Sequence, residues 1–168
     1  MRLLGYYVMR LLGFSALALA CVLLFPSIEG SVEVKIDDSL ILAKLTVAME
    51  AEGESREGKL AVAFVIFNRA RARNKKTISD VILAPFQFSC WNTDSPTRCR
   101  LDQISDSVWA DCEWAVIQAN GVLTNDPTNG ATHYLNEELT RKIRGGSLPS
   151  WVENMTKVAT IGKHSFYK

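Results

Sequence analysis

Hydrophobic positions divide the chain into a leader and a body that follow different patterns. Residues 11–25 read LLGFSALALACVLLF and carry no charged side chain, whereas polar residues interrupt the body at regular spacing. Leu40, Leu45 and Met49 fall on one face of a helix. Gly53 follows that pattern and favours a left-handed helix end. The body is therefore predicted to begin with an amphipathic helix that ends near Gly53.

An unbroken apolar run, LAVAFVIF, occupies residues 60–67. A helix that is apolar all round is buried on every side, so we predict a helix that Ser55 caps and that crosses the centre of the domain. The β-branched residues of the run also suit a buried strand, and the pattern alone leaves that alternative open.

The remaining pattern predicts two more helices and a mixed tail. Residues 77–83 suit a short helix that Pro85 stops, and residues 86–104 suit a loop. Ser105 and Gly121 bound a longer amphipathic segment with the residues expected at helix ends. The tail beyond it favours short strands with one short helix. These elements predict a mainly α (α+β) single domain with a few short strands.

The leader indicates export. Arginines and a 15-residue apolar run are typical of a signal peptide, and the run is shorter than the ~20 residues of a spanning helix. We predict a signal peptide or N-terminal membrane anchor at residues 1–30, a linker at 31–37 and the domain at 38–168. No clear cleavage site follows, so residues 3–25 could also hold the protein to the inner membrane. The expected location is the periplasm or cell-wall space.

Composition and charge narrow the classes of function that the chain could have. The chain is 48% hydrophobic and 22% charged, which is typical of globular proteins. A net charge of +1 argues against a nucleic-acid partner. In an oxidising compartment Cys90 and Cys99 are candidates for a disulfide across a short loop, which would leave Cys112 outside the pair. The sequence does not decide the pairing.

Four carboxylates precede the apolar run, in the segment AMEAEGESREGK. Glu50 stands at the end of an apolar helix, where partial desolvation and the negative end of the helix dipole both favour its protonated form. A protonated carboxyl group there can act as a general acid toward a glycosidic oxygen. Glu54 is interpreted as a second catalytic candidate or a capping residue, and Glu52 and Glu57 as surface or capping residues.

This segment resembles the opening motif of the cell-wall hydrolase family typified by the spore cortex-lytic enzyme SleB. The motif runs from Glu50-Ala51-Glu52-Gly53-Glu54 to Asn68-Arg69. Three later blocks continue the resemblance in order: QFSCWN at 87–92, GATHYLN at 130–136 and IGKHSFYK at 161–168. Four ordered blocks from about residue 38 onward are a far more specific signal than any one of them.

The resemblance implies a lysozyme-like fold and cleavage of peptidoglycan between N-acetylmuramic acid and N-acetylglucosamine. It implies that Glu50 is the catalytic acid of a lytic transglycosylase, which leaves 1,6-anhydro ends. A muramidase-type hydrolase is the alternative, and it would need a second carboxylate about 5–10 Å from the first. Glu54 and Asp94 are the candidates for that second group.

Candidate groove residues come from the later blocks, because sugars need aromatic faces and hydrogen-bonding partners. The predicted substrate-binding residues are Phe88, Trp91, His133, Tyr134 and Asn136. We expect no cofactor. We also expect no metal site, because the two histidines lack the spacing of a metal motif.

Two other classes of function fit parts of the sequence. Cys90 with His133 or His164 could supply the nucleophile and base of a cysteine peptidase. The domain could also bind glycan strands as a structural factor without cleaving them. A partly buried Glu50 favours the enzyme, because a binding module has no need of such an acid.

Overall fold

The computed structural model describes residues 38–72, 77–92, 95, 98–121 and 124–168, and for residues 98–100 it describes the backbone alone. The predicted leader at 1–30, the linker at 31–37 and the candidate carboxylate Asp94 lie outside the described residues. No helix within these ranges is long and apolar enough to cross a membrane.

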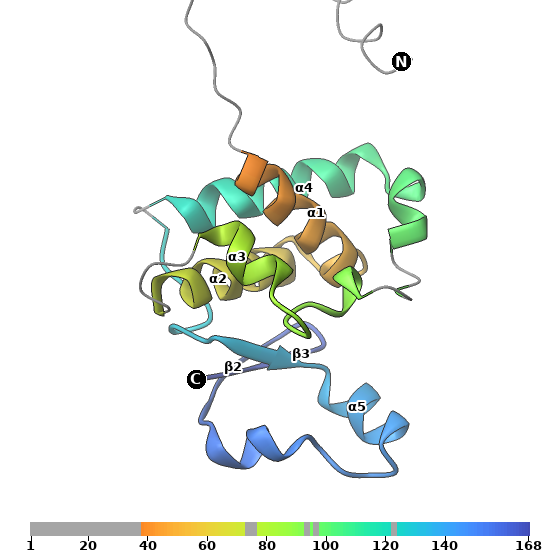
Figure 1. Ribbon diagram of the computed structural model, residues 1–168, viewed down its shortest axis with the longest axis vertical. Helices are drawn as coiled ribbons and strands as arrows, with labels where there is room; N and C mark the ends of the chain where they lie inside the picture. Colours follow the sequence, from red (N-terminus) through yellow and green to blue (C-terminus); the bar gives the residue numbers. More distant parts are fainter. Residues whose placement is uncertain (1–37, 73–76, 93–94, 96–97, 122–123) are drawn as a thin grey trace, which may run out of the picture. The chain divides into compact units, whose positions relative to one another are not determined.

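The described residues form a mainly helical domain with one small sheet, which confirms the predicted fold class. Figure 1 shows α1 to α4 together on one side of the sheet and α5 on the other. In chain order the elements are α1 (Asp38–Ala51), α2 (Arg56–Ala72), α3 (Ile78–Leu83), η2 (Ser89–Trp91), η3 (Arg98–Gln103), α4 (Asp106–Asn120), β1 (His133–Leu135), α5 (Glu137–Ile143), η4 (Ser150–Asn154), β2 (Lys157–Ile161) and β3 (His164–Tyr167).

Local capping explains why the helices begin where the sequence predicts. The Ser55 hydroxyl accepts from the backbone N–H of Gly58 at the start of α2. Thr77 and Asp80 form a reciprocal capping box at α3. The Ser105 hydroxyl accepts from the N–H of Val108, which opens α4. These side chains satisfy N–H groups that the first turn of a helix leaves without partners.

The apolar run of α2 is a central helix, so the alternative of a buried strand is wrong. Val62 and Ile66 belong to the main core, which α2 shares with α1, α3 and α4. Ala61 and Val65 instead pack against Phe166 of the sheet. The helix is apolar all round because it is covered by helices on one side and by the sheet on the other.

The sheet is antiparallel with the order β1-β3-β2, so β3 is central. Tyr134 pairs with Phe166, and both contact the cluster against α2. Their neighbours His133 and Tyr167 also pair, and both rings lie against Trp151. Because side chains alternate between the two faces of a strand, β1 directs Tyr134 toward the helices and His133 away from them.

Glu137 should make the fold sensitive to acid. Hydrogen bonds from Lys157 and Tyr167 lower the pKa of Glu137 from 4.5 to about 2. A carboxyl group with a lowered pKa stabilises the fold above its unfolded value and loses that contribution as the pH falls through its folded value. The free energy of unfolding should therefore decline between pH 4.5 and about 2. In Glu137→Gln, denaturant unfolding should show a shallower decline across this range, and an unchanged slope would contradict the assignment.

Candidate active site

The side-chain carboxylate of Glu50 is held by three donors from two other parts of the chain. Oε1 accepts from the hydroxyl of Ser89 at 3.1 Å and from the backbone N–H of Cys90 at 2.9 Å. Oε2 accepts from the hydroxyl of Tyr134 at 3.0 Å. The side chain of Glu50 is partly buried. Glu50 is therefore a carboxyl group that is fixed at both oxygens and still partly open to solvent.

The local fold explains how these donors converge. Glu50 occupies the last turn of α1, and η2 carries Ser89 and Cys90. The indole N–H of Trp91 donates to the buried hydroxyl of Thr46 on α1 at 3.0 Å, which ties η2 to the same helix. Tyr134 comes from β1, so the site joins the helical layer to the sheet.

Tyr134 is a protonated donor throughout the neutral range. Burial, and then the charge and hydrogen bond of Glu50, hold the pKa of Tyr134 well above its usual value. The ring lies edge-on to His164 at 5.1 Å between centroids and against Phe166 at 5.8 Å. These contacts fix the direction of the hydroxyl group, which makes Tyr134 a positioning residue for Glu50.

Tyr134→Phe should test this positioning role. A hydrogen bond to a charged group contributes about 1.5–3 kcal/mol, so the variant should lose roughly 10- to 100-fold in the rate of a reaction in which the Glu50 carboxyl group takes part. The loss should fall on kcat with little change in KM, because the hydroxyl contacts Glu50. Initial rates over a range of substrate concentrations separate the two constants. A change confined to KM would assign Tyr134 to substrate binding instead.

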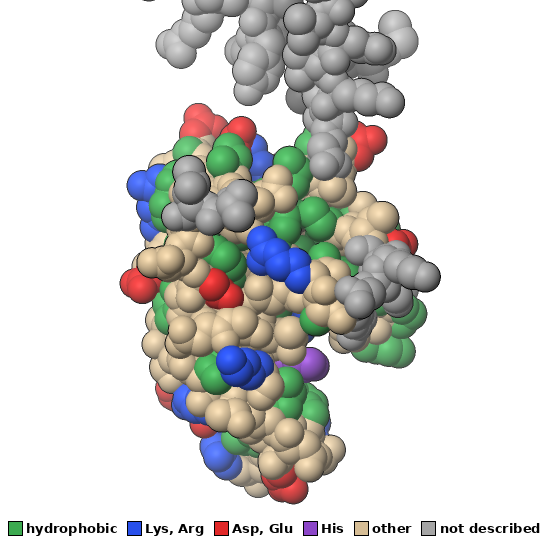
Figure 2. All heavy atoms as spheres, turned by 90° about the vertical axis from the view of Figure 1, so that its left-hand side faces the viewer, with side chains coloured by type: hydrophobic (Ala, Val, Ile, Leu, Met, Phe, Trp, Pro, Cys, Tyr) green, Lys and Arg blue, Asp and Glu red, His purple; other side chains and the backbone are tan. Residues whose placement is uncertain are grey.

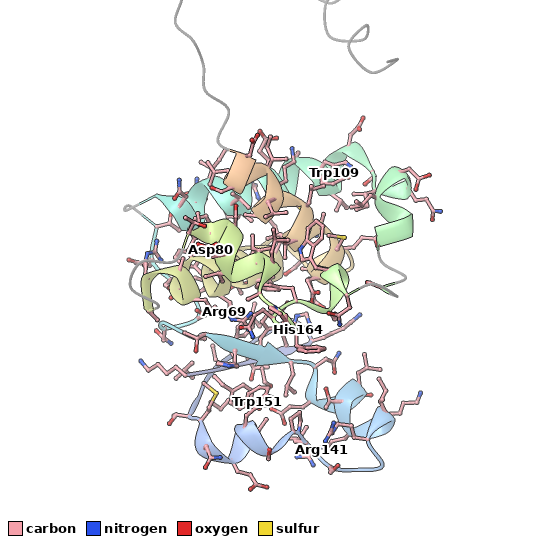
Figure 3. All side chains as sticks on the ribbon, viewed as in Figure 1. Arg69, Asp80, Trp109, Arg141, Trp151 and His164 are labelled. Atoms are coloured by element: carbon pink, nitrogen blue, oxygen red, sulfur yellow. The ribbon has the colours of Figure 1, made fainter. Side chains whose placement is uncertain are left out.

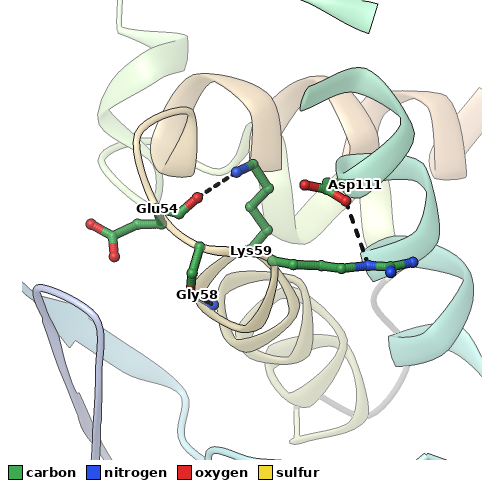
Figure 4. A network of polar contacts seen from close by, with 6 residues as sticks. Glu54, Gly58, Lys59 and Asp111 are labelled. Carbon is green, nitrogen blue, oxygen red and sulfur yellow. Dashed lines mark hydrogen bonds and ion pairs between the residues drawn. The ribbon is translucent and has the colours of Figure 1, made fainter. Parts of the chain in front are cut away.

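Glu54 does not continue α1, because that helix ends at Ala51. Its carboxylate turns to the loop between β2 and β3, where Oε2 accepts from the N–H of Lys163 at 3.2 Å. A Cβ on Gly162 would come within 2.0 Å of the same oxygen, and this residue has φ +58. Glycine at 162 thus leaves room for the Glu54 carboxylate. Figure 4 shows that the backbone carbonyl of Glu54 accepts a separate hydrogen bond, from the buried ammonium group of Lys59.

His164 lies near both glutamates but is not a charged partner for them at neutral pH. Burial lowers the pKa of His164, although the charges of Glu54 and Glu50 act in the opposite direction. Within the described part of the chain, its buried Nδ1 has no hydrogen-bond partner. The ring of His164 packs edge-on against Tyr134 and supports that side chain.

Arg69 connects the two parts of the chain that hold Glu50. This buried side chain donates from Nε to the carbonyl of Thr132, just before β1. It donates from Nη1 to the carbonyl of Gln87 at 3.1 Å, and its guanidinium group lies 4.7 Å from the centre of the Phe88 ring. Figure 3 shows Arg69 between the helices and the sheet. The loop before η2 and the start of β1 are therefore joined through one side chain.

A cavity of about 310 Å³ adjoins this site. One wall comes from the loop after α3 and the other from β1 and η4, and Tyr134 links the cavity to Glu50. Figure 2 shows a histidine side chain in the recess between the upper, helical part of the body and its lower part. The residues that line the cavity are Arg69, Phe86, Gln87, His133, Tyr134 and Trp151.

The structure brings together only some of the predicted groove residues. His133 and Tyr134 line the cavity. Phe88 is only 2% exposed, so its ring belongs to the core, whereas Trp91 is partly exposed and its indole N–H donates to Thr46. Asn136 caps α5, because its Oδ1 accepts from the N–H of Leu139 at 2.9 Å. That cap could have been found from an asparagine that precedes two glutamates.

Sequence reasoning missed several contributors to the site. Ser89, the backbone of Cys90, Arg69, Phe86 and Trp151 were not among the predicted site residues, although Ser89, Cys90 and Arg69 lie within the quoted motifs and Phe86 directly precedes one of them. No local signal distinguishes Phe86, which lies outside those blocks and follows a proline in a predicted loop.

The structure bears on the chemistry of two of the cysteines, Cys90 and Cys112. Cys90 is buried, so its thiol is not presented to a substrate as a peptidase nucleophile would be. The proposed Cys90–Cys99 disulfide stays a prediction, because the side chain of Cys99 lies outside the described residues. Burial raises the pKa of the Cys112 thiol to about 11, which makes it unreactive. The described residues contain no cluster of histidine, cysteine or acidic side chains suited to a metal ion.

Comparison with known proteins supports a cell-wall enzyme. A family model described as Cell Wall Hydrolase matches residues 53–167, a range that begins just after Glu50. A spore cortex-lytic enzyme from Halalkalibacterium halodurans is 31% identical over 132 residues, which make up 77% of this chain and 34% of the relative. The chain therefore spans about a third of the length of this curated relative.

Two solved structures share the fold. The catalytic domain of the SleB protein of Bacillus cereus is 27% identical, with a TM-score of 0.58 over 79% of this chain and 91% of that chain. The catalytic domain of the germination-specific lytic transglycosylase SleB of Bacillus anthracis is 26% identical, with a TM-score of 0.58 over 81% of this chain and 98% of that chain. Both are isolated catalytic domains, and the shared part includes nearly all of each.

Proposed function

Because the chain belongs to the cell wall hydrolase family, we propose that it cleaves the bond between N-acetylmuramic acid and N-acetylglucosamine in peptidoglycan. Glu50 is the proton donor to the oxygen of that bond. The observation that carries the proposal is the fixed carboxyl group, which receives hydrogen bonds from Ser89, the backbone of Cys90 and Tyr134. The hydroxyls of Ser89 and Tyr134 can either donate or accept, so they can hold Glu50 in both of its protonation states.

We propose lytic transglycosylation as the reaction. Protonated Glu50 gives its proton to the glycosidic oxygen as the bond to C1 of muramic acid breaks. The resulting carboxylate then removes the proton of the C6 hydroxyl, whose oxygen bonds to C1 and closes the 1,6-anhydro ring. One carboxyl group serves as acid and then as base, and no water is consumed.

The position of Glu54 bears on the choice between transglycosylation and hydrolysis. A hydrolase of either stereochemistry uses a second carboxylate close to the scissile bond. The carboxylate of Glu54 is engaged by the N–H of Lys163 at the turn between β2 and β3. The other candidate, Asp94, lies outside the described residues. A muramidase-type hydrolase therefore remains the second candidate, and product chemistry decides between them.

Mass spectrometry of the fragments released from purified peptidoglycan tests the proposal with the full chain. Anhydro-muramic ends are expected. Reducing muramic ends would replace transglycosylation with hydrolysis, and the search for the second carboxylate would begin at Glu54. Released peptides would indicate a peptidase. Binding without any released fragment would indicate a non-catalytic glycan-binding domain.

The proposed substrate also sets where the protein acts. Peptidoglycan lies outside the cytoplasm, so we propose that the domain works in the periplasm or cell-wall space. Residues 3–25 would tether it to the inner membrane if the leader is not cleaved. Cell fractionation of the full chain, with and without residues 1–30, distinguishes a tethered protein from a released one.

A further inference from the structure

Phe86 combines two features that are unusual for a phenylalanine. Its side chain is 90% exposed, and its backbone has φ +61. Among the residues that the structure describes, Asn129 is the other non-glycine residue with a positive φ. Asparagine tolerates this region well, whereas for a bulky side chain it is an outlier. Strained residues of this kind concentrate at sites of function.

The neighbouring contacts hold the Phe86 turn in place. The N–H of Gln87 donates to the carbonyl of Ala84 at 3.2 Å and closes the turn. Arg69 donates to the carbonyl of Gln87, and the next aromatic ring, Phe88, is buried beneath that guanidinium group. The turn is thus anchored immediately after Phe86, and the ring is displayed outward rather than tucked into the core.

The displayed ring borders the cavity beside Glu50. Phe86 and Trp151 are aromatic residues of its lining, and Arg69, Gln87 and His133 are polar ones. Tyr134 belongs to the same lining and donates to Glu50. A volume of about 310 Å³ is at the lower end for sites that bind small molecules. A sugar ring has an apolar face of C–H groups and a polar edge, and this lining offers both kinds of surface.

We propose that Phe86 is the stacking platform of a sugar subsite next to Glu50, where it binds the apolar face of an N-acetylated hexosamine of the glycan strand. The polar side chains of the cavity then face the hydroxyl and acetamido groups of the same sugar. This inference rests on the proposed function, because it names the group of the substrate that the cavity takes. Exposure of the ring is what stacking requires, and the turn closed by Gln87 holds the ring at the edge of the cavity.

The test compares Phe86→Gly, Phe86→Trp and the wild type. Glycine adopts a positive φ without strain, so Phe86→Gly should keep or raise the melting temperature of the protein. It should nevertheless weaken binding of a soluble N-acetylglucosamine oligosaccharide by roughly 3- to 10-fold, the range of one aromatic contact. Phe86→Trp should restore the affinity. Calorimetric titration of the full chain measures Kd for each variant.

Ile143→Ala is the matched control, because Ile143 is an exposed apolar side chain on α5 at 74% exposure and does not line the cavity. Its Kd should equal that of the wild type. An unchanged Kd in Phe86→Gly, or no binding by the wild type, would overturn the platform. A wild type that binds the oligosaccharide but releases nothing from peptidoglycan would refute the proposed function, and weaker binding by Phe86→Gly would still support the platform.

Discussion

Replacing Glu50 with glutamine should lower the rate of peptidoglycan cleavage by at least about 10²- to 10⁴-fold, the usual contribution of a general acid and base. Glutamine has the shape of glutamate but can neither donate a carboxyl proton nor take one back. Its amide oxygen can still accept from the N–H of Cys90, and its amide N–H can donate to the hydroxyl of Tyr134. The Glu50→Gln variant should therefore keep its fold but lose its cleavage activity.

Glu57→Gln is the control for this experiment. Glu57 is an exposed carboxylate in the first turn of α2, and it undergoes the same chemical change. Fragment release measured by mass spectrometry should match the wild type in this control and fall to background in Glu50→Gln. Equal thermal unfolding of the two variants would exclude misfolding. Retained cleavage in a folded Glu50→Gln would remove Glu50 from the mechanism.

Replacing Arg69 with methionine should lower the free energy of unfolding by about 2–6 kcal/mol. The variant leaves the carbonyls of Thr132 and Gln87 without their donor, and an unsatisfied buried polar group costs about 1–3 kcal/mol. Activity should fall as well, because Arg69 joins the loop before Ser89 to the strand that carries Tyr134. Denaturant unfolding gives the stability, and fragment release gives the activity.

Two further variants make this prediction specific. Arg144→Met removes an exposed arginine after α5 and should change the unfolding free energy little. Arg69→Lys keeps the charge but loses the planar fork that reaches two carbonyls, so its stability should lie between those of Arg69→Met and the wild type. If Arg69→Met were as stable as Arg144→Met, the hydrogen bonds of Arg69 would not be what joins the loop before η2 to β1.

The helices were predictable because their signals are local. The caps at Thr77 and Ser105 lie within a few residues of the N–H groups that they satisfy. The run at residues 60–67 was ambiguous for one reason: an element that is buried on all sides has no polar face to reveal its period. The length and position of this run did not distinguish a helix from a strand. The structure explains its uniform hydrophobicity, because the run packs against helices on one side and against the sheet on the other.

The site was predictable only in part, because its geometry depends on long-range pairing. Glu50 was identified from its place at a helix end and from a motif, but Tyr134 reaches it across 84 residues of sequence. The loop after α3 shows the limit most clearly. The sequence predicted Phe88 as a substrate-binding residue, whereas the structure buries Phe88 and exposes Phe86. The backbone of Phe86 has a positive φ, and we found no pattern in the sequence that predicts this conformation for a phenylalanine.

The strand order has a consequence for when the protein can become active. β3 is the central strand, yet it follows both of its neighbours in the sequence. While the chain emerges from the ribosome, β1 therefore has no partner strand until residues 164–167 are free. Until then Tyr134 lacks Phe166 and His164 beside it, although α1 and α2 can already form. The helical layer can thus be complete well before Tyr134 is fixed beside Glu50, so the proposed active site would be assembled last.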